Sequence, residues 1–442
     1  MKETLASLWS RTVSRAPRAL AVVESLNACR WSRAELDESA GSWRSGLPAG
    51  SSLRGQRIVI AEPNGFEWLR VFLGIIQSGG VPAPVDPDEP ADARETIARR
   101  IGASWIWAGD HLRPVQAPRR PQGRDVCLLK VTSGSTGLPK AFPFTHREMI
   151  ADGRQICATM DIREDDVNLA VIPFGHSYGL GNLVVPLLVQ GTAVVCGRGP
   201  FPHAIASDCR SWGPTVLAAV PILFRALADA DIPAESLATL RVVISAGSPL
   251  PAGVAQAFFA KFGRHIHGFY GSSETGGICY DRTGQATLSG RSVGTPLDGV
   301  RIVPTRGRRF TVESPAVMGG GRHSPRDYGT MSPAGELVIL GRSDRTVKIG
   351  AKRLDPAEVE IALKALPSVR EAIVFPHPSG SEGLAAAVVS SDSPAAIRRA
   401  LAGRIAAWKF PDRIVVFQEF PVTARGKPDL RRIGSSLGDG GP

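Results

Sequence analysis

The chain has 442 residues, which is too many for one small hydrophobic core, so we expect two or three domains. Hydrophobic residues make up 43% of the chain and charged residues 21%, a composition typical of an ordinary soluble globular protein. The formal net charge is +11, but the arginines are scattered and accompany no recognised nucleic-acid-binding motif. The charge therefore favours a solvated basic surface or, as the sharper alternative, attraction to an anionic partner; no nucleic acid is expected.

The cysteines and the apolar segments predict a cytoplasmic protein with reduced thiols. No two cysteines form a C-x-x-C pair or stand at the spacing of metal ligands. The most apolar stretch, residues 180–196, is interrupted by Asn182, Pro186 and Gln190, so we expect no membrane span. The first residues lack the long apolar region of a signal peptide and predict an amphipathic helix. The six cysteines are Cys29, Cys127, Cys157, Cys196, Cys209 and Cys279.

Strand and helix patterns alternate from about residue 57. Residues 57–61 are a short apolar run typical of a buried strand. Residues 64–78 place Leu69 and Phe72 with later apolar residues at helical spacing, and two glycines end the helix. Residues 81–85 predict a strand whose two prolines favour an edge position.

A loop rich in glycine and hydroxyl side chains follows the apolar run at residues 126–129. Residues 128–140 spell L-L-K-V-T-S-G-S-T-G-L-P-K and end at Lys140. Backbone N–H groups and hydroxyls in such a turn cradle anionic oxygens, and the lysine adds a point charge. The loop is not a Walker A motif, because Pro139 replaces its second glycine and Ala141 its Ser/Thr. It therefore predicts a polyphosphate site, and a plain surface turn is the weaker interpretation.

The alternation continues beyond this loop and predicts parallel sheets covered by helices on both faces. Ligands of such sheets bind at the carboxyl ends of the strands, so we expect the functional loops there. The predicted strands are residues 167–172, 192–196, 215–220, 240–245 and 265–270, with helices at 221–230 and 253–262 among them.

The pattern changes after about residue 291, where β-rich segments with glycine and proline turns indicate a small barrel-like or distorted sheet. Asp355, Pro356 and Glu358 then form a helix start resembling a capping box. We place a first domain at residues 1–343 and a small α+β domain at residues 344–442. Its predicted helices are 356–366 and 394–407, and its strands are 371–375, 384–389 and 413–417; the β-rich segments before it are 301–311 and 336–340.

Seven motifs follow one another along almost the whole chain, and in this order they resemble the adenylate-forming superfamily. That superfamily contains acyl- and aryl-CoA synthetases, adenylation domains of peptide synthetases, and luciferases. The resemblance implies an α/β fold, with a large N-terminal domain of parallel α/β subdomains and a small β-barrel-like region, and a small mobile α+β lid domain. The motifs are F-L-G-I-I-Q-S-G-G-V-P-A-P-V-D-P (72–87), T-S-G-S-T-G-L-P-K (132–140), P-F-G-H-S-Y-G-L (173–180), S-A-G-S-P-L (245–250), Y-G-S-S-E-T (270–275), G-R-S-D-R-T-V-K-I-G (341–350) and T-A-R-G-K-P-D-L-R (423–431).

The resemblance implies a reaction in two halves. A carboxylate attacks the α-phosphate of ATP to give an acyl-adenylate and pyrophosphate, and a thiol then displaces AMP. The thiol would belong to coenzyme A or to the phosphopantetheine of an acyl carrier protein. The protein must align two anions and neutralise their charge. The glycine-rich loop would hold the β- and γ-phosphates through Thr132, Ser133, Gly134, Ser135, Thr136, Gly137 and Lys140.

The resemblance assigns further nucleotide contacts to the strand-like segment near residue 270. Tyr270 would lie against the adenine ring, Gly271 would allow a close approach, and Ser273 would face the α-phosphate. Glu274 matches the magnesium ligand of the family, because a carboxylate beside phosphate oxygens needs a cation between them. A solvated glutamate is the weaker alternative. The same site would include Gly247 and Ser248.

Four residues in the last third of the chain complete the nucleotide site that the resemblance implies. Asp327 would accept hydrogen bonds from the ribose hydroxyls, although only the acid of the family's T-G-D triplet is present and a turn-capping aspartate is the alternative. Arg342 would approach the ribose and phosphates, and Asp344 would be the hinge. Lys427 would be the catalytic lysine, entering from the small domain to neutralise charge at the α-phosphate.

The predicted acid pocket draws on several of the same motifs. Amino-acid-activating relatives carry an aspartate near Pro173, but residues 173–178 contain no acid here. Since an unpaired ammonium would be costly to bury, a plain acyl or aryl acid is favoured as the small-molecule substrate. His176 resembles a gating histidine and, with Glu274 and Lys427, forms the predicted catalytic set; a structural histidine is the alternative. The pocket would be lined by Phe174, His176, Tyr178, Gly247, Gly271 and Gly276.

Two departures from the family pattern affect the acceptor. Ala141 follows Lys140 where the family has glycine, and Gly350-Ala351 alters the turn that lines the thiol tunnel. An enzyme that passes its adenylate to a non-thiol acceptor therefore stays open. A non-catalytic binding relative is a further alternative, and a luciferase-type oxygenase has no sequence feature in its favour. The joint presence of Glu274, Asp327, Arg342 and Lys427 argues against the non-catalytic relative.

Overall fold

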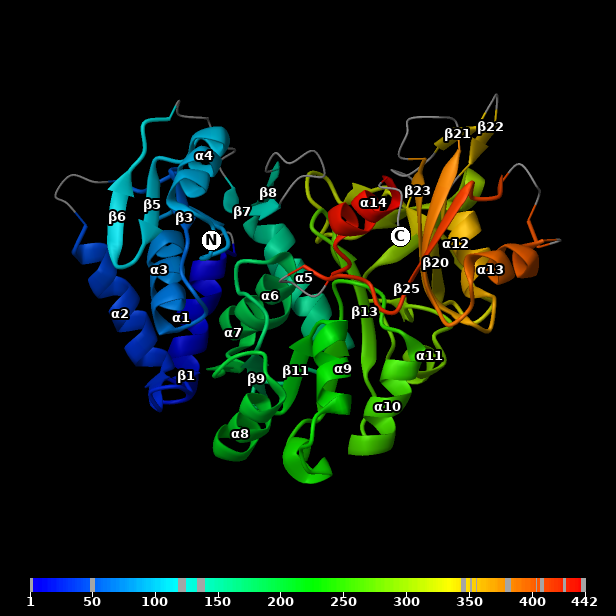
Figure 1. Ribbon diagram of the computed structural model, residues 1–442. Helices are drawn as coiled ribbons and strands as arrows, with labels where there is room; N and C mark the ends of the chain where they lie inside the picture. The colour runs from blue at the N-terminus through cyan, green and yellow to red at the C-terminus, as the bar shows by residue number, and fades with distance from the viewer. Residues whose placement is uncertain are drawn as a thin grey trace. The chain divides into compact units, whose positions relative to one another are not determined.

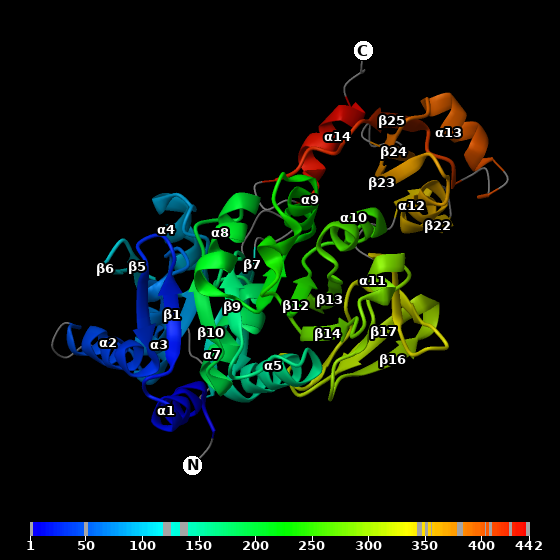
Figure 2. The ribbon, with the colours of Figure 1, turned by 90° about the horizontal axis from the view of Figure 1, so that it is seen from below.

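The described part of the chain falls into two compact units (Figures 1 and 2). Unit 1 comprises Met1–Val303 and Val312–His323, and unit 2 comprises Pro304–Thr311 and Ser324–Pro442. No helix among the described residues is both long and apolar enough to cross a bilayer. The computed structural model describes residues 3–47, 52–117, 125–132, 140–342, 347–349, 352–354, 356–377, 383–402, 404–405, 409–423 and 427–438.

A nine-stranded sheet forms the centre of unit 1. Its order is β15-β14-β13-β12-β11-β9-β10-β1-β2, and the neighbours from β13 to β1 are parallel, whereas β2, β14 and β15 join antiparallel. The strands are β1 (Leu20–Glu24), β2 (Cys29–Ser32), β9 (Val167–Ala170), β10 (Ala193–Cys196), β11 (Val216–Ala219), β12 (Val242–Ser245), β13 (His267–Ser272), β14 (Gly276–Tyr280) and β15 (Thr295–Pro296).

Helices cover both faces of this sheet because its central strands are apolar on both sides. One face packs on α8 (Pro202–Trp212), α9 (Pro221–Asp229) and α10 (Ala252–Phe262), whose Ile205, Phe224 and Phe258 belong to one buried cluster with residues of β1, β9, β10, β11 and β12. Helices α5 (His146–Thr159) and α7 (Val185–Gln190) lie on the other side in Figure 2.

A second, four-stranded sheet belongs to the N-terminal part of unit 1 and has the order β4-β3-β5-β6. The edge position of β4 confirms the expectation from its prolines. Helix α3 packs against this region with the apolar residues of its helical pattern buried. The strands are β3 (Arg57–Ile60), β4 (Val81–Pro84), β5 (Trp105–Ala108) and β6 (His111–Pro114), and the helices nearby are α1 (Leu5–Arg15), α2 (Arg33–Ser45), α3 (Phe66–Gln77) and α4 (Ala91–Ile101).

The remaining elements of unit 1 are short. An antiparallel hairpin, β7 (Val126–Thr132) and β8 (Lys140–Thr145), runs directly into α5, whose N-cap Thr145 forms a capping box with Glu148. Helix α6 (Ser177–Gly179) continues through a wide π-type turn, η1 (Leu180–Val184), into α7. The others are η2 (Ala234–Leu237), α11 (Gln285–Ser289) and β18 (Arg322–His323). The boundary between the units crosses β16 (Arg301–Thr305) and β17 (Arg309–Glu313), and η3 (Arg306–Arg308) between them belongs to unit 2.

Unit 2 contains a three-stranded sheet in the order β23-β24-β25 with helices on both faces. Alternate residues of β24 explain this, because Ala386 and Val388 pack with α12 and α13, whereas Ala387 and Val389 pack with α14. Two hairpins precede it. The elements are β19 (Asp327–Met331), β20 (Leu337–Arg342), β21 (Val347–Ile349), β22 (Lys352–Leu354), α12 (Pro356–Lys364), β23 (Val369–Pro376), β24 (Leu384–Ser390), α13 (Pro394–Leu401), β25 (Arg413–Phe417) and α14 (Leu430–Gly438).

The α/β class with its parallel sheet and smaller second part is confirmed, and all six cysteines are free thiols. One predicted helix is too long. Helix α13 ends at Leu401 instead of residue 407, because Ala402 already leaves helical geometry and Gly403, a poor helix former, follows it. The domain boundary between residues 343 and 344 falls outside the described residues and stays a prediction.

Candidate active site

Two of the segments predicted to bind the nucleotide lie at the carboxyl ends of parallel strands of unit 1. Gly247 and Ser248 follow the end of β12 by two and three residues, and the motif at 270–275 forms the end of β13 and the turn after it. Gly247 has a φ of +91°, which glycine adopts without strain. Both segments therefore lie at the edge where sheets of this type bind ligands, and the roles of their residues stay predictions.

The predicted phosphate loop connects β7 to β8 in the chain. Thr132 and Lys140 are partners across the two strands, so the loop between them starts and ends at one point. Lys140 is exposed. The loop residues Ser133, Gly134, Ser135, Thr136 and Gly137 lie outside the described residues, and their phosphate contacts stay predictions.

The turn between β13 and β14 holds Ser273 and Glu274. Thr275 is fully buried, and its hydroxyl accepts a hydrogen bond from Ser272 N at 3.3 Å. The carbonyl of Glu274 accepts another from Met318 N at 3.0 Å. A Cβ at Gly271 would overlap the carbonyl oxygen of Gly276, so only glycine allows this pairing of the strands. The backbone that carries the Glu274 carboxylate is therefore fixed from two sides.

The segment that precedes α6 is attached to a distant loop through Asn64. Its amide nitrogen donates to Ile172 O at 2.8 Å, and its amide oxygen accepts from Phe174 N at 2.7 Å. Phe174 is fully buried, and its ring centroid lies 5.3 Å from that of Trp68. Its assignment to the pocket lining stays a prediction. His176, half-buried, caps α6, and its carbonyl accepts from Leu180 N.

Two side chains of α6 connect this segment to the sheet. Ser177 Oγ donates to Ser273 Oγ at 3.1 Å, and Tyr178 Oη donates to Ile244 O at 3.0 Å. Burial raises the pKa of Tyr178 well above its usual value, so the phenol stays protonated and remains a donor. The predicted acid-binding segment thus lies directly beside the predicted nucleotide-binding turn.

The predicted residues of unit 2 form two groups. Asp327 and Arg342 are strand partners across β19 and β20, although fifteen positions separate them in the chain. Lys427 is exposed, and its backbone is held by Thr423, whose N–H donates to Lys427 O at 2.8 Å. The predicted hinge residue Asp344 lies outside the described residues. The roles of all four stay predictions.

The residues around Glu274 fit a magnesium ion that is bound mainly by nucleotide oxygens. No group of three or more histidine, cysteine, aspartate or glutamate side chains that could hold a metal occurs among the described residues. Mg²⁺ is usually held by one or two carboxylates together with substrate phosphates, and a single half-buried carboxylate at the turn matches that pattern.

Sequence reasoning missed three side chains next to the site: Asn64, Lys130 and Asp152. Asn64 looks like an ordinary loop residue in the sequence. Lys130, however, interrupts an apolar strand, and Asp152 shares one helix face with Glu148 and Gln155. These two patterns could have indicated that Lys130 and Asp152 are buried polar residues.

The model of the AMP-binding enzyme family matches residues 9–117 and 106–308, and that of the AMP-binding enzyme C-terminal domain matches residues 358–427. The chain belongs to the AMP-binding enzyme family and thereby to the adenylate-forming superfamily. It is accordingly an AMP-forming ligase of the acid–thiol type. Its relatives include enzymes named as CoA ligases and CoA synthases, which are of this type.

Several relatives are named for aromatic acids. A feruloyl-CoA synthase from Amycolatopsis sp is 26% identical over 94% of this chain and 96% of its own length. A 4-hydroxybenzoate–CoA/benzoate–CoA ligase from Rhodopseudomonas palustris is 30% identical over 70% of this chain and 64% of its own length. A p-hydroxybenzoic acid–AMP ligase from Mycobacterium tuberculosis is 26% identical over 84% and 60%.

Solved structures confirm the fold. ATP-bound MatB from Rhodopseudomonas palustris matches with a TM-score of 0.81 at 22% identity, covering 98% of this chain and 99% of that one. Klebsiella oxytoca NpsA in complex with 3-hydroxyanthranilyl-AMSN matches with a TM-score of 0.83 at 19% identity, covering 99% and 100%.

Proposed function

We propose that this enzyme uses ATP and Mg²⁺ to activate an aromatic carboxylic acid as its acyl-adenylate and then transfers the acyl group to the thiol of coenzyme A. In the first step a carboxylate oxygen bonds to the α-phosphorus and pyrophosphate leaves. In the second, the thiol sulfur bonds to the acyl carbon, AMP leaves, and the thiol proton passes to solvent.

The hydrogen bond between Ser177 and Ser273 is the observation that carries this proposal. Adenylate formation requires the carboxylate and the α-phosphate to lie side by side, although both are negative. Ser177 follows His176 in the predicted acid-binding segment, and Ser273 precedes Glu274 in the predicted nucleotide-binding turn. A 3.1 Å contact between their hydroxyls supports adjacent binding of the two reactants.

Each predicted residue has a role that its chemistry suits. Mg²⁺ bound by Glu274 would offset charge on the phosphates. The hydroxyls and Lys140 of the phosphate loop would hold the leaving pyrophosphate, and Lys427 would stabilise the charge that develops at the α-phosphate. Asp327 and Arg342 would fix the ribose, and Tyr270 the adenine. His176 would close the acid pocket from one side.

An aromatic acid fits the surroundings of α6. The ring of Tyr178 lies 5.9 Å from that of Phe269, and its hydroxyl is bonded to the main chain, so the ring would offer apolar contact to an aromatic acid. Residues 173–178 contain no carboxylate that could bind an ammonium group. The names of the relatives, which include benzoate, hydroxybenzoate and ferulate, support the same class of acid.

Pyrophosphate release across a panel of acids tests the proposal. We expect benzoate, 4-hydroxybenzoate, anthranilate or ferulate to give a kcat/KM at least about tenfold above that of acetate, octanoate and phenylalanine. Acetate and octanoate lack the aromatic contact, and phenylalanine would bury an unpaired ammonium group. Adding coenzyme A should convert the acyl-adenylate to a thioester with release of AMP, and the thioester is detected by mass. Activity with fatty or amino acids alone would contradict the aromatic assignment, and no release with any acid would contradict the activity.

A second acceptor is favoured by one relative, the p-hydroxybenzoic acid–AMP ligase. Its name describes an adenylate product without coenzyme A. If pyrophosphate release with an aromatic acid is rapid and coenzyme A gives no thioester, the acyl group goes to a carrier-protein thiol or to a non-thiol acceptor. Incubation with a phosphopantetheinylated carrier protein then separates these two.

Replacement of Asn64 by alanine should weaken binding of the acid more than binding of ATP. The change removes both hydrogen bonds to the segment at 172–174, which leads to His176. At about 1 kcal/mol each, their loss should raise KM for the acid by about tenfold or more, with KM for ATP changed less than threefold. Steady-state kinetics with each substrate varied in turn measures the split.

Gln256 provides the matched control for this variant. It is exposed on α10, and its amide nitrogen donates to Leu288 O at 3.1 Å. Gln256→Ala should leave both KM values unchanged. Equal increases in the two KM values of Asn64→Ala would show that Asn64 does not act on the acid segment.

A further inference from the structure

Helix α5 carries a row of buried polar side chains that bond to segments between residues 298 and 319. Glu148, Asp152, Gln155 and Thr159 recur at helical spacing, and none is more than 8% exposed. Gly319 N donates to Glu148 at 2.8 Å, Ser314 Oγ to Gln155 at 3.1 Å, and Asp298 N to Thr159 at 2.9 Å. The row therefore orders backbone far from α5 in the sequence.

Asp152 is the second residue of this row and contacts the turn between β13 and β14. Its Oδ1 accepts a hydrogen bond from Gly277 N at 2.9 Å. Gly276, with a φ of +70°, lies so close that a Cβ on it would overlap the same carboxylate. The Asp152 carboxylate therefore packs directly against the end of the turn between β13 and β14, which carries Glu274.

Two further segments meet at the same carboxylate. Lys130, on the strand that enters the phosphate loop, has its Nζ 3.9 Å from Asp152 Oδ2. Gly181, in the π-type turn after α6, would place a Cβ 3.3 Å from the same oxygen. Asp152 thus contacts three segments: the β7–β8 hairpin (the phosphate hairpin), the turn between β13 and β14 that carries Glu274, and η1, which continues α6.

Lys130 is an unusual partner for this carboxylate. It is 1% exposed, its Nζ lies 4.0 Å above the ring of Phe144, and that nitrogen has no hydrogen-bond partner within the described part of the chain. Burying a charge without full hydrogen bonding costs stability, and burial lowers the pKa of Lys130 and raises that of Asp152. Packing alone gives no reason for this pair.

We propose that Lys130 and Asp152 are positioning residues that hold the phosphate hairpin and the Glu274 turn in register for MgATP. Asp152 fixes Gly277, and Lys130 supplies the counter-charge that keeps the carboxylate in place. The inference rests on the proposed function, because it assigns MgATP to this site.

Binding of MgATP to four variants, measured by isothermal titration calorimetry, tests the pair without knowledge of the acid. Asp152→Leu removes the acceptor of Gly277 N and should raise the Kd for MgATP by about 10- to 100-fold, the effect of one charge-assisted hydrogen bond. Lys130→Met should raise the Kd by about tenfold, because the buried Asp152 carboxylate keeps the hydrogen bond from Gly277 N but loses its counter-charge. Asp152→Asn keeps an acceptor for Gly277 N but leaves the buried Lys130 without its counter-charge. It should raise the Kd by a similar factor.

The double variant Lys130→Met/Asp152→Asn separates positioning from general stability. It removes both charges and retains an acceptor for Gly277 N, so its Kd should return to within about threefold of the wild type, better than either single variant. The control is Asp208→Asn, because Asp208 is fully buried and accepts from Arg198 N at 3.0 Å elsewhere in unit 1. It should melt at a lower temperature with an unchanged Kd.

The outcomes are distinct. Wild-type binding of MgATP by folded Asp152→Leu would overturn the inference and leave the proposed function intact. If Asp152→Leu does not fold, the comparison of Lys130→Met with the double variant decides, and a double variant that binds no better than the singles overturns the pair. Failure of the wild-type protein to bind MgATP removes the proposed function and the inference with it.

Discussion

Replacement of Lys427 by alanine is expected to lower the rate of adenylate formation by about 100- to 1,000-fold, the usual effect of removing one group that stabilises transition-state charge. The side chain would act at the α-phosphate, where negative charge builds up as pyrophosphate leaves. Binding of ATP should change little, because the residues proposed to bind the phosphates and the ribose lie in other segments of the chain. Pyrophosphate release and calorimetric binding of MgATP measure the two effects.

The local structure gives Lys427 a defined position within unit 2. Val422 and Pro428 form a β-bridge, and the Thr423 hydroxyl accepts a hydrogen bond from Lys427 N at 3.3 Å. Lys364, exposed in the last turn of α12, is the matched control, and Lys364→Ala should keep full activity. Pyrophosphate release at the wild-type rate by Lys427→Ala would show that another group carries the charge.

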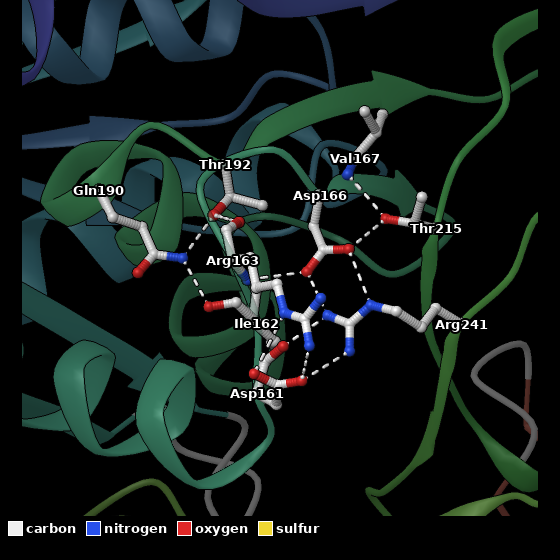
Figure 3. A network of polar contacts seen from close by, with 9 residues as sticks. All are labelled: Asp161, Ile162, Arg163, Asp166, Val167, Gln190, Thr192, Thr215 and Arg241. Carbon is white, nitrogen blue, oxygen red and sulfur yellow. Dashed lines mark hydrogen bonds and ion pairs between the residues drawn. The ribbon is translucent and has the colours of Figure 1, made fainter.

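Replacement of Arg241 by methionine should destabilise unit 1 by about 2–3 kcal/mol at pH 7, because it leaves the buried carboxylate of Asp166 without its guanidinium. Figure 3 shows the network. Arg241 bonds to Asp166 and, at 3.0 Å, to Asp161, while Thr215 Oγ1 donates to Asp166 at 2.7 Å and accepts from Val167 N at 2.9 Å. These contacts join the amino-terminal ends of β9, β11 and β12.

The destabilisation should depend on pH in a stated direction. Burial alone would raise the pKa of Asp166, but hydrogen bonds from Arg241, Thr215 and the Arg163 N–H outweigh it, and the pKa is lowered. A carboxylate with a lowered pKa stabilises the folded state above its unfolded pKa of about 3.9, and this contribution is lost as the pH falls through the folded value. The difference between wild type and variant should therefore be full at pH 7 and shrink below about pH 4.

Urea unfolding followed by tryptophan fluorescence measures this difference, since seven of the eight tryptophans, all except Trp408, belong to unit 1. Arg99→Met is the control, because Arg99 is 62% exposed in its pair with Glu95 and should contribute less than about 0.5 kcal/mol. A loss for Arg241→Met that stays constant from pH 7 to pH 3.5 would rule out Asp166 as its cause.

Much of the fold could be predicted because its elements depend on short patterns. The strand at 384–389 is a run of small and β-branched residues that is buried on both faces, and helix α9 begins at a proline as its sequence suggests. Helix α14 was not predicted. Its apolar positions, Ile433 and Leu437, are few, and only their packing against β24 makes it a stable element.

We could predict the family, the order of the motifs and the residue types that suit phosphate, metal and acid without the structure, because these depend on side chains within a few positions of one another. Only the tertiary structure brought together Ser177 with Ser273, Asn64 with the segment at 172–174, and Asp152 with Lys130 and Gly277. These pairs are up to 125 positions apart in the chain. Their contacts depend on strand order and on how α5 and α6 pack, which no local pattern specifies.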